Sequence, residues 1–141
     1  MTQHYQSDGV SFDYPDDWQL DREESADGWT VLLQSPSTAF LTLTCDRSGA
    51  GTEEIAAAAL DALKDEYPTL EVQPKVDNLA EQMAVGHDIQ FFSLDLTNTC
   101  WTRSIYSADG VILLLCQCND LELEKYEPTL RAICASLTVE E

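Results

Sequence analysis

The stretch Val10-Ser11-Phe12-Asp13-Tyr14-Pro15-Asp16-Asp17-Trp18 is the most informative part of this chain. Its first five residues predict a short strand, because aromatic residues two positions apart point to the same face of a sheet. A proline then ends the strand, and a tryptophan follows three residues later. The pattern indicates a fold and carries no catalytic motif.

Size and charge limit the classes of function. The 141 residues are in the usual range for one domain, and the 44% hydrophobic content is enough for a core. Acidic residues number 26 against 7 basic ones, for a net charge of −19. Because such a surface repels phosphate groups, we expect no nucleic-acid or lipid partner and favour a basic protein partner. The alternative is an acidic composition that serves solubility alone, as in halophilic or marine sources.

Two features bear on the cellular compartment. No run of about 18 apolar residues is present, and residues 1–8 lack the basic-then-apolar pattern of a signal peptide. The sequence therefore predicts a cytoplasmic protein without a membrane span. The five cysteines form no CxxC pair, which predicts reduced and mostly buried thiols rather than a disulfide framework. They are Cys45, Cys100, Cys116, Cys118 and Cys134.

The first half of the chain predicts strands followed by a helix. After a short strand at residues 18–20, the polar segment 21–27 is expected to be a solvated acidic loop. Residues 29–34 and 39–45 predict a hairpin, since the second segment alternates apolar and polar side chains. Thr52 is expected to cap a helix with an apolar stripe. That helix ends at Tyr67-Pro68, because the residue before a proline avoids helical geometry.

The second half predicts four more strands. Residues 70–76 suit an edge strand, because Pro74 cannot donate a backbone hydrogen bond. Residues 83–96 form a long strand, and Thr97-Asn98 is expected to be the tight turn that follows. Residues 99–107 and 111–118 are the next two strands.

Asp109-Gly110 is the strongest hairpin signal in the chain. If Ala108 pairs with Val111 across a two-residue loop, one face carries three cross-strand pairs and the other face carries Thr102, Ser104 and Tyr106. The expected pairs are Ile105 with Leu114, Arg103 with Cys116, and Trp101 with Cys118.

The C-terminal segment predicts a second helix. Asn119 or Asp120 is expected to cap a first turn, and Pro128 fits the start of the main helix. Apolar residues at helical spacing predict its buried stripe. They are Leu130, Ile133, Cys134 and Leu137.

These elements predict an α+β fold. Neighbouring strands are joined as hairpins, so we expect a mostly antiparallel sheet of about six to eight strands with two helices packed on it. Residues 111–116 are apolar on both faces, which is typical of a central strand covered on both sides. The expected domain spans residues 9–137, with residues 1–8 and 138–141 as tails.

The run Phe12-Asp13-Tyr14-Pro15-Asp16-Asp17-Trp18 resembles the opening of the PsbP-like superfamily. This group includes the photosystem protein PsbP, the Ran-binding nuclear transport factor and bacterial DcrB-like domains of unknown function. The ending Ile133-Cys134-Ala135-Ser136-Leu137 is similar to the helix and serine that close many members. The resemblance, over Gly9 to Leu137, implies an αβα sandwich that binds or scaffolds rather than catalyses. It supplies no catalytic residues, and the missing leader argues against a photosystem or envelope role.

Acidic and aromatic residues make up the candidate interaction surface. Acidic residues surround Trp18, but they lack the ligand order and the glycine of a calcium-binding EF-hand loop, so we predict no metal and no cofactor. Exposed aromatics anchor protein partners, and Trp29, Trp101 and Tyr106 are the large aromatics expected to be partly exposed. The candidate residues are Asp16, Asp17, Trp18, Asp21, Trp101 and Tyr106.

Two weaker chemical candidates have ordinary structural explanations. Cys116 and Cys118 share one strand face, near Trp101 and Arg103, and would be the thiols of a redox site. Buried packing is the commoner role of such cysteines. His87 lies between Val85 and Ile89 on one face, while Asp88 points to the other face, so no catalytic pair is complete.

The function predicted from the sequence is a non-catalytic protein-binding or scaffolding domain, present as a monomer or a homodimer. One alternative is an acidic dimeric secretion-type chaperone, although those proteins typically begin with a helix. A second alternative is a thiol-based redox protein.

Overall fold

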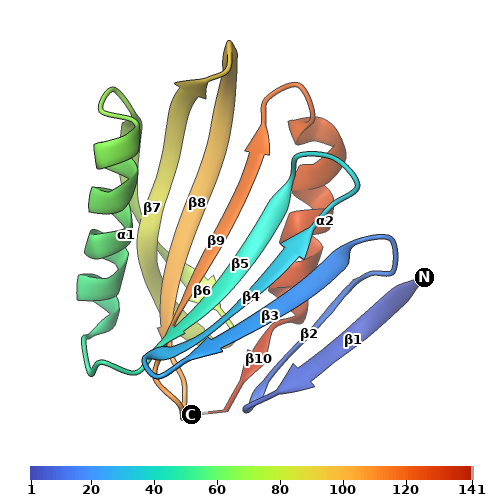
Figure 1. The fold of residues 1–141 in the computed structure, drawn as a ribbon, viewed down its shortest axis with the longest axis vertical. Helices are drawn as coiled ribbons and strands as arrows, with labels where there is room; N and C mark the ends of the chain where they lie inside the picture. Colours follow the sequence, from blue (N-terminus) through green and yellow to red (C-terminus); the bar gives the residue numbers. More distant parts are fainter. Residues whose placement is uncertain (141) are drawn as a thin grey trace.

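The computed structural model describes residues 1–140, which form two helices and ten strands in two antiparallel sheets (Figure 1). The chain is therefore an α+β sandwich, as predicted. In chain order the elements are β1 (Thr2–Ser7), β2 (Val10–Pro15), β3 (Gln19–Ser25), β4 (Gly28–Gln34), β5 (Phe40–Asp46), α1 (Thr52–Glu66), β6 (Glu71–Leu79), β7 (Gln82–Ser93), β8 (Leu96–Tyr106), β9 (Val111–Asn119), α2 (Leu123–Ser136) and β10 (Thr138–Val139).

The larger sheet has seven strands in the order β3-β4-β5-β9-β8-β7-β6. β9 is its middle strand, which confirms that residues 111–116 lie at the centre of the sheet. β6, the strand that contains Pro74, lies at one edge, also as predicted. The smaller sheet has the order β1-β2-β10.

Helix α1 covers one face of the larger sheet, against β7, β8 and β9. Its apolar stripe, including Leu60 and Leu63, packs on a cluster formed by Ile89, Phe91 and Cys100. Tyr67 just after the helix stacks on Phe91, with ring centroids 4.0 Å apart. In Figure 1 this helix stands beside β7, at the opposite end of the sheet from β3.

The other face of the larger sheet is covered by α2 together with the smaller sheet. α2 packs against both β9 and β2, so it joins the two sheets. Leu130 and Ile133 are its main buried residues, as the helical spacing predicted. The larger hydrophobic core of the protein lies in this layer.

The N-terminal stretch forms the strand that the sequence predicts, but in the smaller sheet. Phe12 of β2 is 1% exposed, and Trp18 packs edge-on against Tyr126 of α2 with ring centroids 6.1 Å apart. The expected tails differ from the structure, because Thr2–Ser7 and Thr138–Val139 pair with β2 on its two sides. Glu141, also assigned to the C-terminal tail, lies outside the described residues.

The segment expected to be an acidic loop is the edge strand β3, so this prediction was wrong. β3 pairs with β4 along its whole length. Its inward positions are taken by Leu20 and Arg22, and the Arg22 guanidinium lies 5.0 Å from the ring centroid of Trp29. Because the charged Arg22 occupies an inward position, the sequence of β3 does not show the alternation of apolar and polar side chains that predicts a strand.

The β8–β9 hairpin is where the sequence placed it, but its register differs by two residues. The loop has four residues, Ser107 to Gly110, and the backbone N–H of Ser107 donates a 2.8 Å hydrogen bond to the Gly110 carbonyl. Since a two-residue shift preserves the alternation, each side chain stays on its predicted face. The observed pairs are Tyr106–Val111, Ile105–Ile112, Arg103–Leu114 and Trp101–Cys116.

The turn expected at Thr97-Asn98 lies instead at Leu94-Asp95, and residues 97–98 belong to β8. Leu94 and Asp95 both have left-handed backbone geometry, with φ of 53° and 61°. This geometry suits a two-residue hairpin turn, because it matches the twist of the strands. Leucine rarely takes it, so the sequence signal pointed to the neighbouring Asn98.

Two helix ends also differ from prediction. Gly51 rather than Thr52 precedes the first turn of α1, without a side-chain cap. α2 starts at Leu123, so Pro128 lies inside the helix rather than at its start. Glu122, rather than the predicted Asn119 or Asp120, is the residue at the cap position, and the Asn119 side-chain oxygen accepts a 3.0 Å hydrogen bond from the backbone N–H of Glu122.

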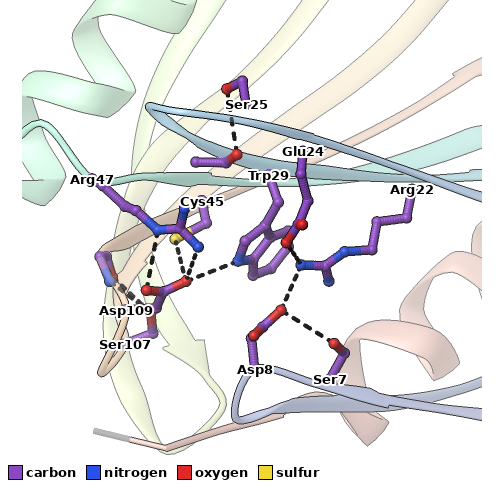
Figure 2. Close-up of polar contacts among 12 residues, drawn as sticks. Ser7, Asp8, Arg22, Glu24, Ser25, Trp29, Cys45, Arg47, Ser107 and Asp109 are labelled. Carbon is purple, nitrogen blue, oxygen red and sulfur yellow. Dashed lines mark hydrogen bonds and ion pairs between the residues drawn. The ribbon is translucent and has the colours of Figure 1, made fainter.

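A polar cluster connects the two sheets at the end of the β8–β9 hairpin (Figure 2). Asp109 accepts hydrogen bonds from Arg47 at 2.7 Å and from the indole N–H of Trp29 at 3.1 Å. On the far side of the indole, Arg22 reaches Asp8 in the β1–β2 turn and Glu24 of its own strand. The buried tryptophan therefore lies between two charged groups of contacts.

Asp109→Asn is expected to destabilise the protein in a pH-dependent way. The hydrogen bond from Arg47, with a smaller contribution from Trp29, holds the pKa of Asp109 below its ordinary value of 3.8, against desolvation. A carboxylate with a lowered pKa stabilises the folded state above 3.8 and loses this effect as the pH falls through its folded pKa. Thermal unfolding should therefore separate wild type from variant at pH 7, with the gap closing under acid. A gap that stays constant down to pH 3 would contradict the assignment.

Candidate functional site

The candidate site is a groove between α2 and the β6–β8 part of the larger sheet, here called the α2 groove. Two cavities make it up, one of about 500 Å³ and one of about 570 Å³. Both are lined by Trp101 and Arg131, so they adjoin at these two residues. The first is bounded by the end of α2 and the β6–β7 turn, and the second by the start of β6 and the middle of β7 and β8.

The groove exists because α2 covers only part of its face of the sheet. α2 packs on β9 and on β2, whereas β6 and β7 extend beyond it. Side chains alternate along these strands, and on the α2 side they are mostly polar. On β6 and β7 this side carries Glu71, Gln73, Lys75, Asp77, Asp88 and Gln90.

Arg103 lies at the bottom of the groove and is only 4% exposed. Its guanidinium donates a 3.0 Å hydrogen bond to Asp77 and a 2.9 Å hydrogen bond to Asp88. It also donates to the carbonyl of Thr102 at 2.7 Å. Burial disfavours its charge, but the hydrogen bonds to the two carboxylates raise the pKa of Arg103 overall. The arginine is thus fully engaged within the protein.

Arg131 of α2 lies over the indole of Trp101, with its guanidinium carbon 4.1 Å from the ring centroid. Glu127, one helical turn earlier, is 4.0 Å from the same guanidinium. Arg131 itself is half exposed, and its stack on Trp101 lies between the two cavities. Without the arginine, the face of Trp101 would open to the groove.

The walls of the groove carry more acidic than basic groups. Both arginines already contact carboxylates or an aromatic ring, while Glu71 and Glu81 form no ion pair within residues 1–140. The groove therefore attracts cations on balance. The charged lining residues are Glu71, Asp77, Glu81, Asp88, Arg103, Glu127 and Arg131.

The residues of the predicted interaction surface do not form one surface. Asp16 and Asp17 are exposed in the β2–β3 turn, and Asp21 is exposed on β3. Trp18 is 5% exposed and packs inside against α2, so it does not share their exposure. Trp101 lies in the α2 groove, on the other side of the molecule's central strand from β3.

The predicted exposure of the aromatic residues was right for only one of three. Tyr106 is 56% exposed, whereas Trp29 and Trp101 are each 2% exposed. Each tryptophan is covered by an arginine that the local sequence does not place beside it, Arg22 and Arg131 respectively. Trp101 and Tyr106 also lie on opposite faces of β8 because they are five residues apart.

The face of the larger sheet that carries Thr102 and Ser104 of β8 is closed at these two residues. Both residues are buried, on the side of the sheet that carries α1. The same face is half exposed instead at Thr30 of β4 and at Thr42 and Thr44 of β5, because α1 does not extend over them.

His87 lies on the α1 face with Val85 and Ile89, and Asp88 points to the opposite face, as predicted. Its Nδ1 atom is buried without a hydrogen-bond partner in the structure. Burial, with a contribution from Lys64, lowers the pKa of His87. Across residues 1–140 it has no carboxylate partner, so the geometry assigns it no acid–base pair.

The cysteines are all free, and the structure pairs them differently from the sequence-based hypothesis. Cys116 and Cys118 do share one face of β9, but the Cys118 thiol donates to the carbonyl of Asn119 at 3.3 Å. Cys116 lies next to Cys134 of α2, with the two sulfur atoms 3.9 Å apart. Within the described chain no three His, Cys, Asp or Glu side chains gather as metal ligands would.

Several residues of the groove were not predicted. Asp77, Asp88, Glu127 and Arg131 come from three elements that only the packing of α2 and the sheet brings together. One signal was available in the sequence, namely an arginine at position 103 inside a strand of otherwise uncharged residues. A buried arginine requires acidic partners, so it indicates carboxylates nearby without identifying them.

No helix in the described part of the chain is long and apolar enough to cross a membrane. No protein-family model matches the sequence, and no curated protein matches it.

Solved structures do share the fold. PsbP from the cyanobacterium Synechocystis sp. PCC 6803 superposes with a TM-score of 0.66 at 11% identity, over 98% of this chain and 92% of its own. PA94 from Pseudomonas aeruginosa, a protein of unknown function, has a TM-score of 0.61 at 16% identity, over 99% and 98% of the two chains. LpqN of Mycobacterium tuberculosis, involved in cell envelope biogenesis, has a TM-score of 0.57 at 17% identity, over 100% and 90%. These likenesses confirm the predicted PsbP-like fold, and at such identities they concern the fold alone.

Proposed function

We propose that the protein is a non-catalytic binding domain that holds a basic segment of a partner protein in the α2 groove. The observation that carries the proposal is the charge of the groove, where five carboxylates line the walls and the two arginines are already engaged. The net charge of −19 would steer a basic partner toward the molecule as a whole. The groove then supplies a concave place of contact.

Trp101 and Arg131 would provide the specific contact within the groove. A lysine or arginine of the partner replaces Arg131 over the indole and pairs with carboxylates at the rim, such as Glu71 and Glu127. Cation–π contacts of this kind contribute about 0.5–2 kcal/mol, depending on how far the cation is desolvated. Displacement of Arg131 also joins the two cavities into one longer site.

The same proposal includes a cytoplasmic location and a protein that is a monomer or a homodimer. Both stay predictions from the sequence. Size-exclusion chromatography with light scattering measures the second of them directly.

The proposal predicts that removal of two groove charges weakens the capture of a basic partner. The groove variant is Glu71→Gln with Glu127→Gln, and the matched control is Asp61→Asn with Asp65→Asn, two exposed carboxylates on α1 at the opposite face. Tagged wild type, groove variant and control are compared in pull-downs from native lysate, eluted by a salt step and identified by mass spectrometry. Exposed charge pairs contribute up to about 1 kcal/mol each. We therefore expect the groove variant to recover roughly tenfold less partner than the wild type, and the control to recover as much as the wild type.

Two results would count against the proposal. Equal recovery by all three proteins would mean that the partner binds elsewhere or through overall charge. If the wild type elutes without any bound protein, the result would contradict the existence of a protein partner.

A further inference from the structure

Cys116 and Cys134 form a thiol pair across the layer between β9 and α2. Their sulfur atoms are 3.9 Å apart, and Cys116 is fully buried behind Cys134. Cys134 is partly exposed and lines the first cavity of the α2 groove. A small solute in the groove therefore reaches Cys134 first, with a second thiol directly behind it.

The other three cysteines have no such arrangement. Cys45, Cys100 and Cys118 are buried, and within residues 1–140 none of their thiols forms a hydrogen bond with another cysteine. Burial raises the pKa of Cys45 and of Cys118 to about 11, and that of Cys100 to about 12. At neutral pH they remain thiols, which are poor nucleophiles.

The pKa values of the two thiols of the pair are shifted in opposite directions. The hydrogen bond from Cys116 lowers the pKa of Cys134, and Arg131 one turn earlier on α2 acts in the same direction, against desolvation. Complete burial raises the pKa of Cys116. Cys134 is thus the thiol of the pair that loses its proton more readily, while Cys116 stays protonated.

We propose that Cys134 is a peroxide-reactive thiol and that Cys116 resolves its oxidised form as a disulfide. The Cys134 thiolate attacks one oxygen of a hydroperoxide, the O–O bond breaks, and the departing oxygen leaves as water or an alcohol after taking up a proton. Cys134 is then a sulfenic acid. The Cys116 sulfur attacks this sulfur, an S–S bond forms, and the second oxygen leaves as water with the Cys116 proton.

Little movement is needed for the second step. The sulfur atoms must close from 3.9 Å to a bond length of about 2.05 Å. Cys134 lies near the end of α2, which ends at Ser136, so the approach concerns the last turn of the helix. Oxidation would then take the thiol out of the wall of the groove.

The test exposes purified, reduced protein to hydrogen peroxide and follows its intact mass. We expect the wild type to lose the mass of two hydrogen atoms, with a peptide map that joins Cys116 to Cys134. Cys116→Ser should instead stop at the sulfenic acid, which dimedone traps on Cys134, and Cys134→Ser should form neither product. Cys118→Ser is the matched control, because it removes a buried thiol of the same strand, and it should behave as the wild type.

A second measurement uses the wild type alone, so a variant that fails to fold cannot affect its result. Brief labelling of the native wild type with iodoacetamide should modify Cys134 at least tenfold faster than any other cysteine. The proposal is overturned if the native protein resists both reagents while the denatured protein reacts. It is equally overturned if the label or the disulfide falls on another cysteine. Neither result depends on the binding of a partner, so this test is separate from that of the proposed function.

Discussion

Gly86→Ala is expected to lower the free energy of unfolding by about 3 kcal/mol or more. A Cβ atom at this position would lie 1.8 Å from the carbonyl oxygen of Thr102 and 3.1 Å from the Cα of Arg103. Both are backbone atoms of the neighbouring strand, so no side-chain rotation relieves the clash, and β7 must move away from β8. Urea denaturation followed by circular dichroism measures the loss.

Gly51→Ala is the matched control for Gly86→Ala. The nearest atom to a Cβ at Gly51 is the Tyr106 hydroxyl oxygen at 3.8 Å, which is an ordinary contact. Gly51 precedes the first turn of α1, where alanine costs about 1 kcal/mol or less relative to glycine. Equal losses in the two variants would contradict the steric explanation. Gly86 also lies opposite Arg103, so its loss should disturb the α2 groove as well.

Trp29→Ala is expected to lower the free energy of unfolding by about 3–5 kcal/mol, the usual cost of removing a large buried aromatic side chain. Trp29 is 2% exposed and belongs to the main core. Its loss would also free Asp109 and Arg22 from their contacts with the indole, which lie on its two sides (Figure 2). Thermal and urea unfolding monitored by far-UV circular dichroism would report the change.

Trp29→Phe separates packing from hydrogen bonding. Phenylalanine keeps most of the buried ring but has no N–H to donate to Asp109, which leaves an expected loss of about 2 kcal/mol. If phenylalanine costs as much as alanine, then the hydrogen bond rather than the packing would dominate at this site. If phenylalanine costs nothing, then the indole N–H would play no part in holding the hairpin loop.

Part of the candidate site could be predicted because strands alternate with a period of two. The sequence placed Trp101, Arg103 and Cys116 on one face of a hairpin. This face assignment survived a two-residue error in register, since only an odd shift exchanges faces. The predicted two-residue loop was wrong, because the observed loop has four residues and is closed by hydrogen bonds between Ser107 and Gly110.

The rest of the site could not be predicted because its residues are far apart in the sequence. Asp77 pairs with Arg103 across 26 positions, and Cys134 meets Cys116 across 18. The two tryptophans were expected to be exposed because the arginines that cover them, Arg22 and Arg131, come from other elements. No local periodicity encodes such contacts.

The amino-acid order determined the α+β class, the antiparallel pairing, the central position of residues 111–116 and the likeness to the PsbP-like fold. Each of these follows from interactions within a few residues or from the side-chain period of a strand. Only the packing of α2 against β9 and the smaller sheet decided that β6 and β7 extend beyond this helix, that Arg131 shields Trp101, and that Cys134 meets Cys116. These features depend on where whole elements dock, and docking is set by the summed burial of many side chains rather than by any local pattern.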